Sequence, residues 1–80
     1  MISIGQFRAL EAQWQAAFDP PYEAGAELRE YGTRVSLAIF KGGQKVYEHR
    51  DQLAECFIDP DSFDLYIERV KAGFPRSRPE

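Results

Sequence analysis

The chain has 80 residues, of which 44% are hydrophobic and 29% charged, and its formal net charge is −3. This length predicts a single globular domain over residues 1–75 with a small core, and the single cysteine, which excludes an internal disulfide, indicates a reducing, cytoplasmic setting. There is no apolar run of about 18 residues and no basic leader region, so we expect neither a membrane span nor a signal peptide.

Acidic residues are concentrated in one stretch of the chain. Between Glu48 and Glu68 there are seven acids and one base, a local net charge of −6, whereas residues 1–47 carry five acids and five bases. The charged residues that follow Glu68 are mostly basic, namely Arg69, Lys71, Arg76 and Arg78 against Glu80. An acidic segment of this kind repels phosphates and attracts basic surfaces.

Residues 3–18 are predicted to form a helix. Ser3 and Gln6 have the spacing of a capping box, in which each side chain bonds to the other residue's backbone. The helix ends at Asp19-Pro20-Pro21, because proline lacks a backbone donor and restricts the residue before it. A connector through Tyr22 to Gly25 is expected next. The apolar residues of the helix recur at helical spacing as one stripe: Phe7, Leu10, Trp14, Ala17 and Phe18.

Residues 26–50 are predicted to form three short strands. Alternation is clearest from Thr33 to Phe40. Gly42-Gly43 indicates a two-residue hairpin turn, which would pair Val46 with Ile39. Gly32-Thr33 can make the preceding turn, which would pair Leu28 with Leu37. Both pairings predict one apolar sheet face, made of Ala26, Leu28, Val35, Leu37, Ile39 and Val46.

The final third contains one ambiguous segment and one clear helix. Residues 51–58 fit either a helical turn or an irregular crossing. Asp59 caps the last helix, Pro60 takes its first position and Gly73 is expected just beyond its end. Residues 76–80 are expected to be a disordered basic tail. The core stripe of this helix is Phe63, Tyr66, Ile67, Val70 and Phe74.

The predicted element order is α-β-β-β-α. The only apolar stripes available to cover the apolar sheet face belong to the two helices. The expected fold is therefore a two-layer α+β domain. It has a three-stranded antiparallel meander sheet, packed on one face by the N- and C-terminal helices.

Residues suited to catalysis or metal binding are few. His49 is the only histidine and lies in no catalytic motif. Cys56 stands among apolar and acidic neighbours, which favours a small buried hydrophobe over a reactive thiolate. The acids from Asp59 to Asp64 lack the calcium-loop pattern, and one Cys with one His excludes a zinc site. We expect no enzyme activity, no cofactor and no metal.

Two surfaces are candidates for binding a protein partner. The first is acidic and consists of Asp51, Glu55, Asp61, Asp64 and Glu68. The second is the outer sheet face, where protein interfaces favour aromatic and arginine side chains. Its candidate residues are Tyr31, Arg34, Phe40, Tyr47 and His49.

The α-β-β-β-α order resembles the double-stranded-RNA-binding domain in topology. In that family the second helix begins with lysines that hold phosphates, whereas the matching turn here carries Asp59, Asp61 and Asp64. Phosphate contacts supply most nucleic-acid affinity, so direct nucleic-acid binding is the least favoured hypothesis.

The favoured hypothesis is a small non-catalytic inhibitor or adaptor that docks its acidic surface on a basic protein partner, which could itself bind nucleic acid. In size and charge the chain resembles small phage-encoded inhibitors, including anti-CRISPR proteins. The alternative is a homodimeric adaptor, or an accessory subunit of an enzyme, that uses the outer sheet face.

Overall fold

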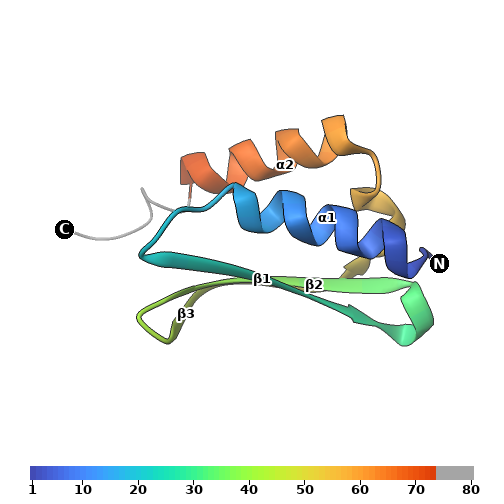
Figure 1. Ribbon diagram of the computed structural model, residues 1–80, viewed down its shortest axis with the longest axis horizontal. Helices are drawn as coiled ribbons and strands as arrows, with labels where there is room; N and C mark the ends of the chain where they lie inside the picture. Colours follow the sequence, from blue (N-terminus) through green and yellow to red (C-terminus); the bar gives the residue numbers. More distant parts are fainter. Residues whose placement is uncertain (74–80) are drawn as a thin grey trace.

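Two helices cover one face of a three-stranded antiparallel sheet, and the opposite face of the sheet is open (Figure 1). This computed structural model describes residues 1–73, so Phe74 and the predicted tail lie outside the described residues. The predicted two-layer α+β fold is confirmed. The elements are α1 (Ile4–Ala16), β1 (Tyr22–Arg29), η1 (Glu30–Gly32), β2 (Arg34–Lys41), β3 (Gln44–Leu53), η2 (Ala54–Phe57) and α2 (Pro60–Gly73).

The N-terminus of α1 has the predicted capping box. Ser3 Oγ accepts a hydrogen bond from the Gln6 backbone nitrogen at 3.0 Å, and the Ser3 backbone nitrogen donates to Gln6 Oε1 at 2.8 Å. The helix ends at Ala16, with Ala17 as its C-cap, two residues before the predicted end. Ala17 and Phe18 nevertheless pack against the core as the apolar stripe predicts.

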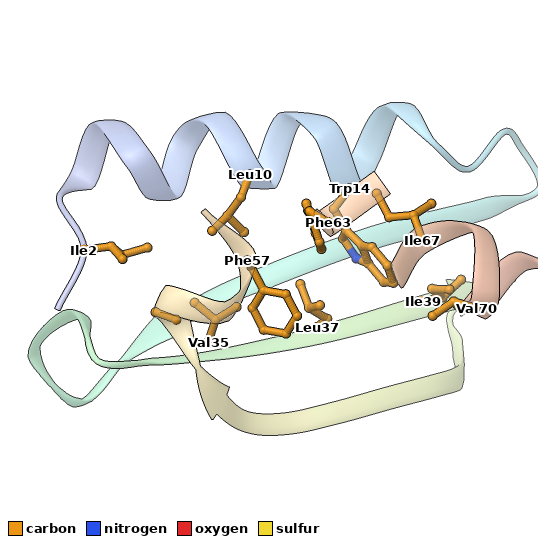
Figure 2. Packing of buried hydrophobic residues seen from close by; sticks show 11 residues of the cluster. Ile2, Leu10, Trp14, Val35, Leu37, Ile39, Phe57, Phe63, Ile67 and Val70 are labelled. Carbon is orange, nitrogen blue, oxygen red and sulfur yellow. The ribbon is translucent and has the colours of Figure 1, made fainter. Parts of the chain in front are cut away.

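Trp14 lies between the sheet and α2 (Figure 2) and is completely buried. Its indole Nε1 donates a hydrogen bond to the Ala38 carbonyl of β2 at 3.2 Å, so the polar atom of this large side chain is satisfied. The ring contacts Phe18 edge-on, with centroids 4.8 Å apart, and stacks near Phe63 at 6.1 Å. Trp14 therefore joins both helices and the sheet.

The first hairpin is longer than predicted. Leu28 pairs with Val35 rather than Leu37, because residues 30–33 all lie in the connection instead of Gly32-Thr33 alone. The register therefore moves by two residues, which keeps the same face apolar. It also extends β1 back to Tyr22, so the predicted connector Tyr22 to Gly25 is strand.

Gly32 is the residue that this connection requires. Its φ is +90°, and its carbonyl accepts a hydrogen bond from the Ile2 backbone nitrogen at 2.8 Å. A Cβ at this position would lie 2.9 Å from the Ile2 carbonyl oxygen. Only glycine combines the positive φ with so close an approach, so the turn also anchors the segment before α1.

The second hairpin has the predicted Gly42-Gly43 turn, but beyond the first pairs the strands do not follow the predicted register. Phe40 pairs with Lys45, whereas Ile39 pairs with Tyr47, so a β-bulge at Val46 adds one residue to β3. A shift of one residue exchanges the two faces of a strand. Val46 is consequently 39% exposed instead of buried, and Tyr47 packs against the core.

The ambiguous segment 51–58 contains the end of β3, the short helix η2 and its C-cap Ile58. Ala54 and Phe57 of η2 are buried, whereas Cys56 is exposed, so the predicted burial of Cys56 is wrong. A 3₁₀ turn places residues three apart on the same side, and Ala54 and Phe57 occupy its inner side.

α2 begins where the sequence predicts. Asp59 Oδ2 accepts a hydrogen bond from the Ser62 backbone nitrogen at 3.2 Å, and Pro60 is the first helical residue. Gly73 lies within the helix rather than beyond its end. The buried cluster is Ile2, Leu10, Trp14, Val35, Leu37, Ile39, Ala54, Phe57, Phe63, Ile67 and Val70.

Neither helix in residues 1–73 is both long enough and apolar enough to cross a membrane.

Candidate functional site

The exposed side of α2 carries three acids around one leucine. Asp61, Asp64 and Glu68 are spaced by three and four residues, so they share one side of the helix, opposite the buried Phe63. Leu65 lies beside them, four residues after Asp61 and three before Glu68, and is 69% exposed. We call this surface, made of Asp61, Asp64, Leu65 and Glu68, the acidic face of α2. It is bounded toward the C-terminus by Arg69 and Lys71.

The carboxylates of this face are not neutralised within the described part of the chain. None of the ion pairs among residues 1–73 involves Asp61, Asp64 or Glu68. The one polar contact is a long hydrogen bond of 3.5 Å from Gln13 Nε2 to Asp64 Oδ1. Asp64 and Glu68 are four apart and repel each other by a few tenths of a kcal/mol, roughly. The face thus keeps its charge available to a partner.

The other two predicted acidic residues do not join this face. Glu55 belongs to η2, and its Oε2 lies 2.8 Å from the Met1 α-ammonium, which holds the Glu55 pKa below its ordinary value. Asp51 belongs to β3, where its φ is +54°. Its backbone nitrogen donates to Ser36 Oγ at 3.1 Å, and its carbonyl accepts from Arg34 at 3.2 Å. Asp51 is therefore bonded to residues of the open sheet face.

Tyr47 and His49 lie on the helix side of the sheet, not on the predicted outer face. The Tyr66 hydroxyl of α2 is 3.0 Å from the Tyr47 hydroxyl and 2.7 Å from His49 Nδ1. The rings of His49 and Tyr66 stack with centroids 5.9 Å apart. The bulge at Val46 is the physical reason, because it turns the following residues of β3 to the opposite face.

This trio holds α2 against the sheet. Burial, with the hydrogen bond between Tyr66 and Tyr47 as a second cause, raises the pKa of Tyr66 well above its ordinary value. Tyr66 therefore stays protonated, and a hydroxyl that keeps its proton is a poor base or nucleophile. The Tyr66 hydroxyl is therefore suited to holding α2 against β3 by hydrogen bonds.

The open sheet face is shallow and mixed in charge. Small residues of β1 and β2, namely Gly25, Ser36 and Ala38, line a hollow of about 270 Å³. Phe40 stands at one end of this hollow, and the Lys45 ammonium lies 5.9 Å from the Phe40 ring centroid. Of the aromatic residues predicted for this face, only Phe40 lies on it.

Tyr31 and Arg34 complete the second predicted surface. Tyr31 is 95% exposed, and its φ of +56° holds it out from the first hairpin connection. It borders a separate hollow beside Met1 and Ile4. Arg34 is partly buried and donates to the Asp51 carbonyl.

No metal centre is formed by the described residues. Within residues 1–73 no three His, Cys, Asp or Glu side chains are grouped so as to hold an ion. Cys56 is exposed beside Glu55 in η2.

Comparison with protein-family models, curated proteins and solved structures gives no match. A function for the chain has to be argued from its surfaces, since many functions can share one fold.

Leu65 is the residue of the acidic face that the sequence argument misses. It lies off the core stripe of α2, which runs through Phe63, Ile67 and Val70. That displacement is the signal for its exposure, because a leucine on the polar side of an amphipathic helix has no core to fill.

Proposed function

We propose that the protein is a non-catalytic binding module that docks the acidic face of α2 on a basic surface of a protein partner. One observation carries the proposal: Leu65, 69% exposed, lies beside three carboxylates of α2 that form no ion pair within residues 1–73. An apolar anchor with a charged rim is the usual anatomy of a specific interface.

The two components of this face have different roles. The carboxylates attract a basic partner over a distance and raise the association rate, which falls as salt rises. Leu65 supplies apolar area that leaves water on contact, roughly 1.5–3 kcal/mol for a fully buried leucine. Charge would therefore govern encounter, and the leucine would govern residence time.

A protein that binds nucleic acid is the partner we favour. Three carboxylates along one side of α2 present negative charge where a phosphate backbone would otherwise lie in a basic groove. A small protein occupying such a groove acts as an inhibitor. The same carboxylates repel phosphates, which argues against direct binding of nucleic acid by this face.

The experiment is an affinity capture from an extract of the source cell, read by mass spectrometry. The baits are the wild type, Asp64→Lys/Glu68→Lys and Leu65→Ser. A matched bait, Glu11→Lys/Asp19→Lys, changes the net charge by the same amount at α1 and at the connection after it. Far-UV circular dichroism checks the fold of each bait.

We expect the wild type and the matched bait to capture the same basic protein. The Asp64→Lys/Glu68→Lys bait should lose it, and Leu65→Ser should retain it only weakly. Equal capture by all four baits would contradict the proposal. Loss with the matched bait as well would show that net charge, not this face, is responsible.

A further inference from the structure

The open face of the sheet has no partner within the described chain, whereas both helices lie on the other face (Figure 1). We propose that this face packs against the same face of a second copy of the chain. The inference concerns a different surface from the acidic face of α2 and does not depend on it. Its support comes from the shape and the charges of the open face.

Charge differs between the two edges of this face. β1 presents Glu23, Glu27 and, at its end, Arg29, whose Nε lies 3.1 Å from Glu27 Oε1. The two acids alternate with the core-facing Tyr22, Ala24 and Ala26. β3 presents Lys45 and Arg50, both of which lie within reach of Glu48 Oε2, at 3.0 and 3.5 Å. The β1 edge thus carries two acids and one base, whereas the β3 edge carries two bases and the acid Glu48. Opposite charges lie at matching heights, since Glu23 and Lys45 both pair with Phe40 of β2.

A two-fold axis parallel to β2 makes these edges complementary. It lays β1 of one copy over β3 of the other, so that Glu23 meets Lys45 and Glu27 meets Arg50, twice each. An axis perpendicular to β2 would instead place acids over acids and bases over bases. Charge complementarity therefore selects one of the two isologous arrangements.

The shape of the face agrees with the same axis. Gly25 and Glu48 both pair with Ala38, so the axis brings Glu48 of each copy over Gly25 of the other. Gly25 has no side chain, and the hollow of about 270 Å³ that it lines leaves room for the Glu48 carboxylate. Phe40, near one end of β2, lies on the axis and meets its own equivalent, which adds an aromatic contact. Arg34, at the other end of β2, also lies on the axis, so the two Arg34 side chains form the one like-charge pair of this arrangement.

The area suffices for a weak dimer. β1 and β2 are eight residues long, and two such three-stranded faces together bury roughly 1,000 Å², the lower limit for a specific interface. Sheets packed face to face turn by about 30° relative to each other, which the long Lys and Arg side chains can span. The two acidic faces of α2 would then point away from each other, so the dimer would be bivalent.

Sedimentation equilibrium of the purified protein, over a range of concentrations, tests the proposal. The variants are Phe40→Asp, Glu23→Lys, Lys45→Glu and the double swap Glu23→Lys/Lys45→Glu. Tyr31→Asp is the matched control, because it also replaces an exposed aromatic by an acid, but away from the open face. Circular dichroism confirms that each variant is folded, and no partner protein is present.

We expect the wild type to approach twice its monomer mass of 9.2 kDa as concentration rises. Phe40→Asp and each single charge reversal should raise the dimer dissociation constant about tenfold or more, and the double swap should restore it. Tyr31→Asp should behave as the wild type. A wild type that stays monomeric, a double swap as weak as its singles, or a Tyr31→Asp monomer would overturn the proposal.

Discussion

The Tyr66 hydroxyl lies 2.7 Å from His49 Nδ1, and this contact joins α2 to the third strand of the sheet. The Tyr47 hydroxyl is 3.0 Å from the same Tyr66 oxygen. Tyr66 has one hydroxyl proton, so it donates to one neighbour and accepts from the other. The orientation of α2, and therefore of its acidic face, depends on a hydrogen-bonded chain of three side chains.

We predict that Tyr66→Phe changes how stability depends on pH at the alkaline end. The pKa of Tyr66 is raised in the folded protein above the ordinary value of 10.0, mainly by burial. The folded state therefore keeps a proton that the unfolded state loses, and stability falls as pH rises above that value. Tyr66→Phe should lose about 1 kcal/mol at neutral pH through its missing hydrogen bonds, and should decline less above pH 10.

Urea denaturation of both proteins between neutral pH and pH 11 measures this difference. His49→Gln is the useful companion, since it removes the imidazole but keeps the Tyr66 hydroxyl. Parallel pH profiles of stability for the wild type and Tyr66→Phe would contradict a raised pKa of Tyr66 in the folded protein.

Trp14→Ala should reduce the free energy of unfolding by roughly 3–5 kcal/mol, close to the whole stability of a small domain. Trp14 is fully buried and contacts both helices and the sheet. Trp14→Phe keeps most of the packing but loses the donor to the Ala38 carbonyl, so it should cost less. Thermal melts of the wild type, Trp14→Phe and Trp14→Ala should give melting temperatures that fall in that order. Equal melting temperatures would refute this packing of Trp14.

Val46 and Tyr47 give a test of the bulge. Val46→Asp should change the free energy of unfolding by less than about 1 kcal/mol, because Val46 is turned outward. Tyr47→Asp should cost more than about 2 kcal/mol, because it places a carboxylate beside Trp14 and Tyr66. A strand without the bulge would reverse the order of the two variants in chemical denaturation.

Cys56 should react with a small aromatic disulfide in the folded protein as quickly as an unfolded thiol, since it is exposed in η2. Cys56→Ser should change the free energy of unfolding by less than about 0.5 kcal/mol. Slow labelling that requires denaturant would mean that Cys56 is buried, as its apolar neighbours in the sequence suggest.

The parts of the fold that were predictable depend on local chemistry. Ser3 with Gln6 defines the start of α1, and Asp59 with Pro60 defines the start of α2. The pair Gly42-Gly43 places the second turn, and apolar spacing identifies Trp14 and Phe63 as core residues. Each of these signals lies within a few residues of the feature that it predicts.

The parts that were not predictable depend on strand register. A bulge at Val46 and a longer first connection leave no signal in the alternation of Val35, Leu37 and Ile39. The bulge moves Tyr47 and His49 to the helix side, and the longer connection shifts β1 by two residues along β2. Register is set by pairing across the sheet and by turn geometry. The acidic surface was predictable on α2, where helical spacing holds, and not for Asp51 or Glu55, whose places depend on the strand end and η2.

The most direct test of the central claim is NMR mapping of the binding surface. Isotope-labelled protein is titrated with the captured partner, and the backbone amide shifts are followed residue by residue. We predict that the largest changes fall at Asp61, Asp64, Leu65 and Glu68, and that they weaken as salt is raised. Changes centred instead on Phe40 and Lys45, with α2 unaffected, would show that the partner binds the open sheet face and would contradict the proposed function.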